Sequence, residues 1–444
     1  MNYTELTEKL VQKCLKAGAG SAEVYLESGR DLSISILNGE IETIEEASSA
    51  GIGFRVIVDG RMGFSHCNDL TEKSLDDTIA RAVEFARLTT PDKYNALPGK
   101  QQIKMVEGLN DPGLTDVSME EKIKRAIDVE KAAMADPAIT KSSGSSYGEG
   151  EYEIFIANSN GVSGSYKSTG CSLGVSVVAE KGDQKNTGGS YCSRRYFSDL
   201  EPIEETAGKA SKKARELLDP IMVKTQRASV IFDPSTAVSL LGGILGALNG
   251  ERVLQGASFL ANSLEQQFAS ELLSVIDDGT RPKGLGSAPF DGEGVPTQKR
   301  VLIDHGVLKG FMHNTISAKR AGTDSTGNAS RRGFTSLPGI GTHNLTVLPG
   351  DSDPDEIISE TSRGILLKNV TGYGINPVNG NFSGGASGLW IENGRIVHPV
   401  KGITIAGTAR EMLMGIDMLG NDVDSQKSFA APTIRIYEMQ IGGK

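Results

Sequence analysis

The sequence lacks the features that mark membrane and exported proteins. Its 444 residues contain no unbroken apolar run near the roughly 20 residues that span a bilayer, so we expect no membrane-spanning helix and no membrane partner. The opening residues, MNYTELTEKL, are polar and acidic, whereas a secretory signal is basic and then apolar. These absences predict a cytoplasmic protein.

Cysteine is also scarce. The four cysteines, Cys14, Cys67, Cys171 and Cys192, show neither CxxC nor zinc-finger spacing. This scatter fits reduced thiols that pack within the fold, rather than a disulfide framework or a metal site. None has the local context of a cysteine protease, and no GxSxG motif lies between a strand and a helix. We therefore expect no self-contained cysteine or serine hydrolase.

Positive charge is in the minority, because 46 Lys and Arg residues face 56 Asp and Glu residues and give a net charge of −10. Proteins that bind a phosphate backbone usually carry a basic face that supplies most of the affinity. The short pairs Arg194-Arg195 and Arg331-Arg332 do not reverse the balance. We expect no nucleic-acid partner.

The N-terminal region, residues 1–223, has the pattern of two copies of one α+β unit. A helical period, extended stretches and a second helical period occur in 3–90 and recur in 117–218, on either side of a Pro/Gly/Lys linker at 91–116. We predict helix, four strands and helix in each copy, with the helices on one face of a sheet. The alternative is a chance recurrence of two ordinary α+β segments.

The C-terminal region, residues 224–444, consists mainly of extended runs punctuated by glycine. The whole chain has 54 glycines, well above the usual share of about 7%. The predicted fold class is therefore α+β, with a duplicated helix/four-strand/helix N-terminal region followed by a β-rich C-terminal domain.

The segment SLLGGILGALNGE, Ser239–Glu251, is apolar and unusually rich in glycine for a helix. Asp233 supplies an N-cap and Pro234 a first helical residue, so the pattern still predicts a helix. Each internal glycine costs about 1 kcal/mol relative to alanine. On one helix face, Gly242 and Gly246 either admit another backbone at close range or leave an open groove.

Three later stretches are similar to one known family. They are FASELLSVIDDGTRPKGLGSAPFDGEGVPTQKRVLIDHGVLKGFMHN, DSTGNASRR and SGLWIENGRIVHPVKGITIAG. In this order they resemble the C-terminal domain of the TldD/PmbA family, which is labelled as modulators of DNA gyrase and is now viewed as metalloproteases. The resemblance covers almost the whole chain, weakly in the N-terminal half and closely from Phe268 to Gly407.

The resemblance also shows what this chain lacks. TldD-type members carry HExxxH upstream of the SELL run, where two histidines bind zinc and the glutamate acts as general base while zinc-bound water attacks a peptide carbonyl. The family spacing places the first histidine at Leu241, the glutamate at Gly242 and the second histidine at Gly246. The tail NDVDSQKSFAAPT also lacks the cysteine that those members supply as a ligand.

The resemblance therefore implies a PmbA- or TldE-type subunit that binds no cofactor itself. Its partner would be a TldD-type HExxxH subunit that carries zinc, and the pair would digest unfolded or extended peptides. This chain would shape the chamber and hold the peptide as an added strand, with exposed apolar side chains around Leu241 and Leu245 lining it. Self-association, as a homodimer with residual activity, is the alternative assembly.

The loop STGNASRRG, Ser325–Gly333, lies near the catalytic cleft in the family. The resemblance implies that Asn328, together with Arg331 or Arg332, binds a substrate backbone or a terminal carboxylate, for which the planar guanidinium is suited. A solvated loop is the alternative.

Two acidic motifs and five histidines complete the candidates. The sequences Asp277-Asp278-Gly279 and Asp291-Gly292-Glu293 could hold a divalent ion or an acid/base pair, but they are also typical of turns, which we favour. No histidine pair has metal-ligand spacing, so we expect no metal site in this chain. The histidines are His66, His305, His313, His343 and His398.

A different class of function is also compatible with the sequence. The chain could be a non-proteolytic regulatory binding protein that modulates DNA gyrase or handles a toxin, an antitoxin or a peptide antibiotic precursor. Its acidic charge permits a protein partner such as gyrase and disfavours DNA. The two classes differ in whether peptide cleavage depends on this chain and on zinc.

Overall fold

The computed structural model describes residues 2–372 and 374–444. Residues 91–116 between the N-terminal units are mostly irregular and end in a short 3-10 helix at Leu114–Asp116. Another 3-10 helix spans Phe197–Asp199. The N-terminal elements are α1 (Tyr3–Lys16), β1 (Ser21–Leu37), β2 (Glu40–Val58), β3 (Arg61–Cys67), α2 (Glu72–Leu88), α3 (Met119–Met134), β4 (Ile139–Asn158), β5 (Ser163–Lys181), β6 (Gln184–Arg194) and α4 (Ile203–Arg215).

The C-terminal region contains short helices among many strands. Its helices are α5 (Pro234–Ala247), α6 (Gly250–Leu254), α7 (Thr315–Ala321), α8 (Pro354–Ser359) and α9 (Ala409–Met414). Its strands are β7 (Gln226–Phe232), β8 (Val275–Asp278), β9 (Lys299–Asp304), β10 (Val307–Leu308), β11 (Ala329–Ser330), β12 (Gly339–Ile340), β13 (Leu345–Val347), β14 (Arg363–Thr371), β15 (Asn381–Glu392), β16 (Arg395–Thr408), β17 (Ile416–Leu419), β18 (Phe429–Ala430) and β19 (Ile434–Gly442).

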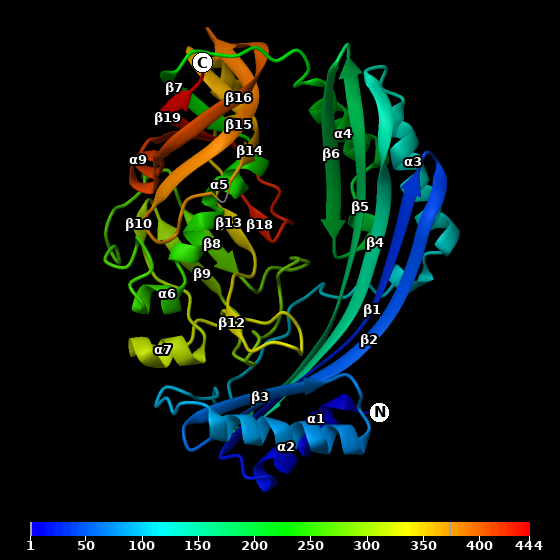
Figure 1. Cartoon of the computed structure of the whole chain (residues 1–444), viewed down its shortest axis with the longest axis vertical. Coiled ribbons are helices and arrows are strands. Elements are labelled where there is room, and N and C mark those ends of the chain that lie inside the picture. Colours follow the sequence, from blue (N-terminus) through cyan, green and yellow to red (C-terminus); the bar gives the residue numbers. More distant parts are fainter. Residues whose placement is uncertain (1, 373) are drawn as a thin grey trace.

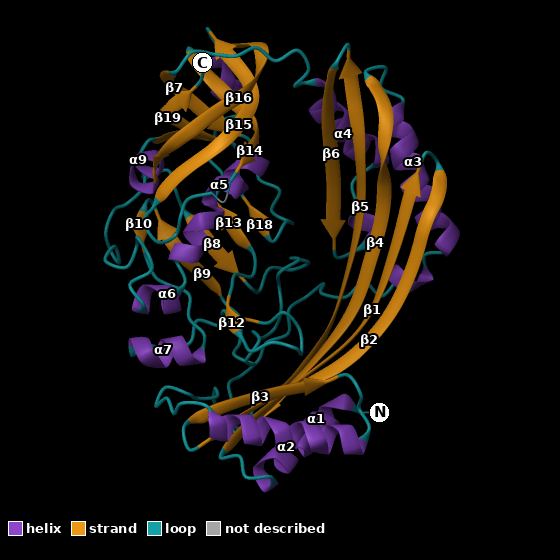
Figure 2. Ribbon diagram, in the orientation of Figure 1, coloured by secondary structure: helices purple, strands orange, loops and turns teal. Residues whose placement is uncertain are grey.

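The N-terminal strands form one long antiparallel sheet in the order β3-β2-β1-β4-β5-β6. The sheet curves around the C-terminal region, and helices α1–α4 cover its outer side (Figures 1 and 2). Alternate residues of β1, such as Leu32, Ile34 and Ile36, are buried in a core that α3 shares. The predicted α+β class is confirmed.

Each N-terminal unit has three strands, so the prediction of four is wrong. The stretches SAEVYLE and DLSISIL belong to the single strand β1, which pairs without interruption with both β2 and β4 across Gly29. That glycine does not end the strand. It leaves room for the ring of Tyr152, which a Cβ atom at position 29 would overlap. The order helix, three strands, helix occurs twice, and a common origin of the two units stays a prediction.

The C-terminal region is rich in strands, as predicted. One sheet has the order β16-β15-β14-β7-β19-β17, and an added pairing of β16 with β19 closes it on itself. A second sheet has the order β10-β9-β8-β13-β18. Among the residues described, no helix is both long and apolar enough to cross a bilayer.

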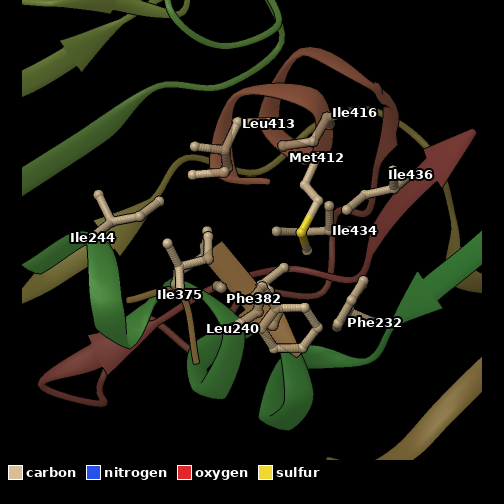
Figure 3. Packing of buried hydrophobic residues seen from close by; sticks show 14 of the residues in the cluster. Phe232, Leu240, Ile244, Ile375, Phe382, Met412, Leu413, Ile416, Ile434 and Ile436 are labelled. Atoms are coloured by element: carbon tan, nitrogen blue, oxygen red, sulfur yellow. The ribbon is translucent and has the colours of Figure 1, made fainter. Parts of the chain in front are cut away.

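The glycine-rich segment forms helix α5, as predicted. The Asp233 side chain caps it by accepting a hydrogen bond from the Thr236 amide at 3.0 Å. Leu240 and Ile244 point into the C-terminal core, which Phe232 of β7 also enters (Figure 3). The helix therefore gains its stability from burial rather than from helix propensity.

The glycines of α5 have different surroundings. The carbonyl oxygen of Ile375 lies where a Cβ atom of Gly243 would stand, and the ring of Pro377 lies against Gly246. Gly242 is exposed and faces open space. Of the two glycines in the prediction, Gly242 has an open side and Gly246 lies against a side chain, whereas the close approach of another backbone occurs at Gly243.

The expectation that Leu241 is exposed and lines a chamber is wrong. Leu241 is only 3% exposed and belongs to the C-terminal core, because the apolar stripe of α5 faces inward. Leu245 is partly buried against the same core.

Replacing Gly243 by alanine tests the close approach. We expect Gly243→Ala to lower the free energy of unfolding by about 3 kcal/mol, because the new methyl group overlaps the Ile375 backbone. The matched control is Gly242→Ala, which adds a methyl group in open space and should raise stability by up to about 1 kcal/mol. Urea denaturation measures both, and equal effects would contradict this packing.

Candidate functional site at the junction of the two regions

A buried cluster of four charged side chains joins the N-terminal sheet to the C-terminal region. Glu23 on β1 and Arg55 on β2 are cross-strand neighbours, and Glu293 and Arg331 come from C-terminal loops. A guanidinium nitrogen of Arg55 donates to Glu293 Oε1 at 2.7 Å, and its Nε donates to Glu23 Oε1 at 3.2 Å. Arg331 also donates to Glu23. All four side chains are at most 2% exposed.

The cluster is balanced, with two positive and two negative charges. Burial by itself lowers the pKa of Arg55, but the carboxylates of Glu23 and Glu293 raise that pKa overall. Burial acts to raise the pKa of Glu293, and the Arg55 charge together with hydrogen bonds from Thr315 and Arg55 lowers it overall. Each charge is held by its opposite, so the cluster fixes geometry rather than exchanging protons.

The predicted turn at Asp291-Gly292-Glu293 is confirmed. The amide of Gly294 donates to the Asp291 carbonyl at 3.0 Å, and Asp291 Oδ1 accepts from the amides of Glu293 at 2.8 Å and Val295 at 3.0 Å. The ion pair of Glu293 with Arg55 was not predicted. Nothing near Glu293 in the sequence identifies a partner on a distant strand.

In the other acidic motif, Asp277-Asp278-Gly279, the two aspartates have different roles. Asp278 makes the predicted turn by accepting a hydrogen bond from the Thr280 amide at 2.9 Å. Asp277 is buried, where it accepts hydrogen bonds from the side-chain amide of Asn328 at 2.8 Å and from the His343 backbone at 2.9 Å. Burial raises the pKa of Asp277, although the nearby His343 opposes the shift.

The loop residues expected to bind substrate lie at the same junction. They differ in whether their side chains are already hydrogen-bonded within the fold. The Asn328 side chain is buried and donates to Asp277 and to the Gly341 carbonyl, so both of its N–H groups are used within the fold. The Arg331 guanidinium is committed to the charged cluster. Of the three candidates in this loop only Arg332 is exposed to solvent, and its role stays a prediction.

Both regions line a cavity of about 300 Å³ beside the cluster. Tyr25 and Tyr166 come from the N-terminal sheet, and His343 and Arg331 from the C-terminal region. Arg195 closes one side by donating to the carbonyls of Thr169 at 2.9 Å and Leu285 at 2.6 Å. The volume is at the lower limit of small-ligand sites, so the cavity has room for a side chain or a chain end but not for a long peptide.

Three of the five histidines are held by contacts within the fold, whereas His66 is exposed and His398 is partly buried. His313 is buried against Gly250, with its Nδ1 atom 3.1 Å from the Ser317 hydroxyl, and burial lowers its pKa. The Nε2 atom of His343 lies 2.6 Å from the Gly327 carbonyl. The Nδ1 atom of His305 lies 3.0 Å from the Glu271 carbonyl. Packing and hydrogen bonds within the fold therefore account for the positions of these three imidazole rings.

The side chains on α5 do not fit a zinc site. Leu241 is buried in the core, Gly242 faces open space and Gly246 packs against a proline ring, so these positions offer no nitrogen, oxygen or sulfur donor. Across residues 2–372 and 374–444, no group of three or more His, Cys, Asp or Glu side chains is arranged to hold a metal ion.

The cysteines are unpaired, as predicted. Cys14, Cys171 and Cys192 are buried, and Cys67 is partly buried. Burial raises the pKa of the thiols of Cys14 and Cys171 to about 12. Such thiols stay protonated at neutral pH and are poor nucleophiles.

Comparison with known proteins identifies the architecture. Models of the PmbA/TldA metallopeptidases match consecutive parts of the chain: domain 1 at residues 22–86, the central domain at 112–218 and the C-terminal domain at 225–443. Metalloprotease PmbA of Escherichia coli O157:H7 is 30% identical over 449 residues, which cover 99% of this chain and 97% of that protein.

Solved structures agree over nearly the whole length. TldE from Thermococcus kodakarensis aligns with a TM-score of 0.90 and 26% identity, covering 98% of this chain and 99% of that one. A Thermotoga maritima protein described as a candidate modulator of a DNA gyrase also reaches 0.90 at 26% identity, covering 99% and 100%. The fold and the three domain matches define the architecture of a metallopeptidase of this type. The chain belongs to the PmbA/TldD metallopeptidase family.

Removing one charge tests the junction. We expect Glu293→Gln to lower the free energy of unfolding by about 3 kcal/mol or more, because it leaves the buried Arg55 cluster with an uncompensated positive charge. The matched control is Glu438→Gln, which breaks the exposed pair with Arg227 and should change stability by less than about 1 kcal/mol. Similar losses in both variants, measured by urea denaturation, would contradict the role of the cluster.

Asp291 makes the free energy of unfolding depend on pH. Burial, reinforced by the negative charge of Glu293, raises the pKa of Asp291 to about 7 in the folded protein. The fold thus favours the protonated form, so the stabilisation is complete below about pH 4 and is lost as the pH rises through about 7. Between those limits, the unfolding free energy of the wild type should fall relative to that of Asp291→Asn. Parallel pH profiles would show that Asp291 has no such role.

Proposed function

We propose that this chain is the zinc-free subunit of a two-chain zinc metalloprotease that degrades unfolded or extended peptides in the cytoplasm. The observation that carries the proposal is helix α5. Counted by the family spacing from the SELL run, its positions 241, 242 and 246 correspond to HExxxH, and they hold leucine and two glycines without a metal donor. The match to Metalloprotease PmbA and the likeness to TldE support a role in peptide hydrolysis.

In this proposal the zinc lies on a TldD-type partner, and this chain supplies shape and peptide binding. The curved N-terminal sheet bends toward the C-terminal region (Figure 1), and the buried cluster of Glu23, Arg55, Glu293 and Arg331 holds the two at a fixed angle. A rigid concave wall of this kind suits one side of a chamber. An extended peptide would bind it through backbone hydrogen bonds, which give low sequence selectivity.

Hydrolysis of an unstructured peptide tests the proposal. The assay uses this chain alone, a TldD-type HExxxH subunit alone and their mixture, each with and without a zinc chelator. We expect cleavage that requires both chains and is abolished by the chelator, because the metal-activated water belongs to the partner.

Two results would contradict the proposal. Activity of this chain alone would reveal a catalytic site of its own. Absence of activity in every mixture, although the HExxxH subunit binds zinc, would favour the non-proteolytic regulatory role instead. A mixture with the Glu438→Gln variant is the matched control, since that change only breaks an exposed ion pair and should leave cleavage unchanged.

A further inference from the structure

One edge of the N-terminal sheet is uncovered along much of its length. Strand β2 pairs with β1 along residues 40–57, but its pairing with β3 begins only at Ile52. Along residues 40–51, which we call the β2 edge, no other strand of the described chain adds to the far side. Every residue from Glu40 to Ser49 is exposed. Alternate backbone N–H and C=O groups of this edge therefore point into solvent.

Of the features that usually keep a sheet edge from pairing, the β2 edge has charged side chains, but all of them are glutamates and repel only chains of the same sign. Lysine and proline are absent from it, and at about a dozen residues it is longer than an average strand. Its pairing with β1 has one bulge, near the start. Ile41 pairs with Ile36 and Thr43 pairs with Ser35, so Glu42 has no partner residue on β1. From Thr43 to Gly51 the register is unbroken. An edge of this kind is a template for another strand.

The two faces of the β2 edge differ in chemistry. Ile41 and Ile44 lie opposite the buried Ile36 and Ile34 of β1, on the side of the helices, yet remain 49% and 43% exposed. An added strand could cover them with an apolar side chain of its own. The opposite face of β2 is directed toward the C-terminal region, because Arg55 on that face pairs with Glu293.

Charge decides which chain fits. The β2 edge contains four glutamates and no lysine or arginine: Glu40, Glu42, Glu45 and Glu46. Only Glu46 has an ion-pair partner among the described residues, Arg30 at 2.9 Å. Pairing with a second copy in this segment would place glutamate beside glutamate, which destabilises a sheet. A chain with lysine or arginine gains the opposite interaction.

We propose that the β2 edge binds extended polypeptide segments in which lysine or arginine alternates with an apolar residue, as an added strand. The basic side chains pair with Glu40 and Glu45 on one face, and the apolar ones cover Ile41 and Ile44 on the other. The inference rests on the proposed peptide-holding role, to which it adds a location and a preference for basic segments. It is tested by binding alone, without zinc, partner or cleavage.

The probe is a fluorescein-labelled 12-residue peptide of alternating lysine and valine, titrated with the full chain and followed by anisotropy. A peptide of alternating glutamate and valine should not bind. The lysine peptide with alternate backbone amides N-methylated should also fail, because it keeps its charge but loses the donors needed for strand pairing.

Charge reversal on the edge locates the site. Glu40→Lys/Glu45→Lys should weaken the lysine peptide by about tenfold and should allow the glutamate peptide to bind, because it turns cross-strand attractions into repulsions. The control is Asp77→Lys/Glu84→Lys on the exposed surface of α2, which makes the same change in net charge and should leave affinity unchanged.

The proposal is overturned if N-methylation has no effect, since binding is then only electrostatic. It is overturned equally if both double variants weaken binding alike, or if the lysine peptide does not bind the wild type. Sedimentation of the wild type completes the test, because a dimer that Glu40→Lys/Glu45→Lys alters would make a second copy the occupant. Binding as expected with no cleavage in the two-chain assay would leave this site standing while the protease role fails.

Discussion

The buried ion cluster of Glu23, Arg55, Glu293 and Arg331 is the interaction on which the arrangement of the molecule depends. Two of its side chains belong to neighbouring strands of the N-terminal sheet and two to C-terminal loops. Four charges without solvent are tolerated only when each faces its opposite at hydrogen-bonding distance. The cluster therefore admits one relative placement of the two regions, and a small displacement would leave charges unpaired.

This fixed placement organises the rest of the junction. Arg331 lies over the ring of Tyr25, 4.8 Å from its centroid, and thereby forms one wall of the small shared cavity. Asn328 and Asp277 extend the polar network into the C-terminal region. The concave face of the sheet is held toward the C-terminal strands, while the β2 edge remains outside this network and open to another chain.

Part of the fold could be predicted because its causes are local. An aspartate before a proline caps α5 wherever the helix is placed, and the alternation of β1 indicates which residues face the helices. The strand count failed at Gly29, since a glycine that ends a strand and one that accommodates Tyr152 look alike until the partner strand is known. The apolar stripe that contains Leu241 is typical of a buried helix, and the exposed position expected for Leu241 came only from the chamber role that the resemblance implies.

The candidate site was harder to predict than the fold. The similarity of several ordered motifs identified the family, whereas the match of positions 241, 242 and 246 to the zinc motif depends on the spacing from those motifs and stays a prediction. For loop side chains such as Asn328 and Arg331, the local sequence does not distinguish a residue that binds substrate from one that stabilises the fold. Only the distant partners Glu23 and Asp277 reveal that their hydrogen bonds are already used.

The central claim is that this chain contributes shape and binding but no metal. The most direct measurement is the zinc content of the purified chain after incubation with zinc and removal of the excess, beside an HExxxH subunit treated in the same way. The account predicts retained zinc in the HExxxH subunit and none in this chain, because α5 offers no donor side chains at the family positions. One tightly held zinc per molecule of this chain would contradict it.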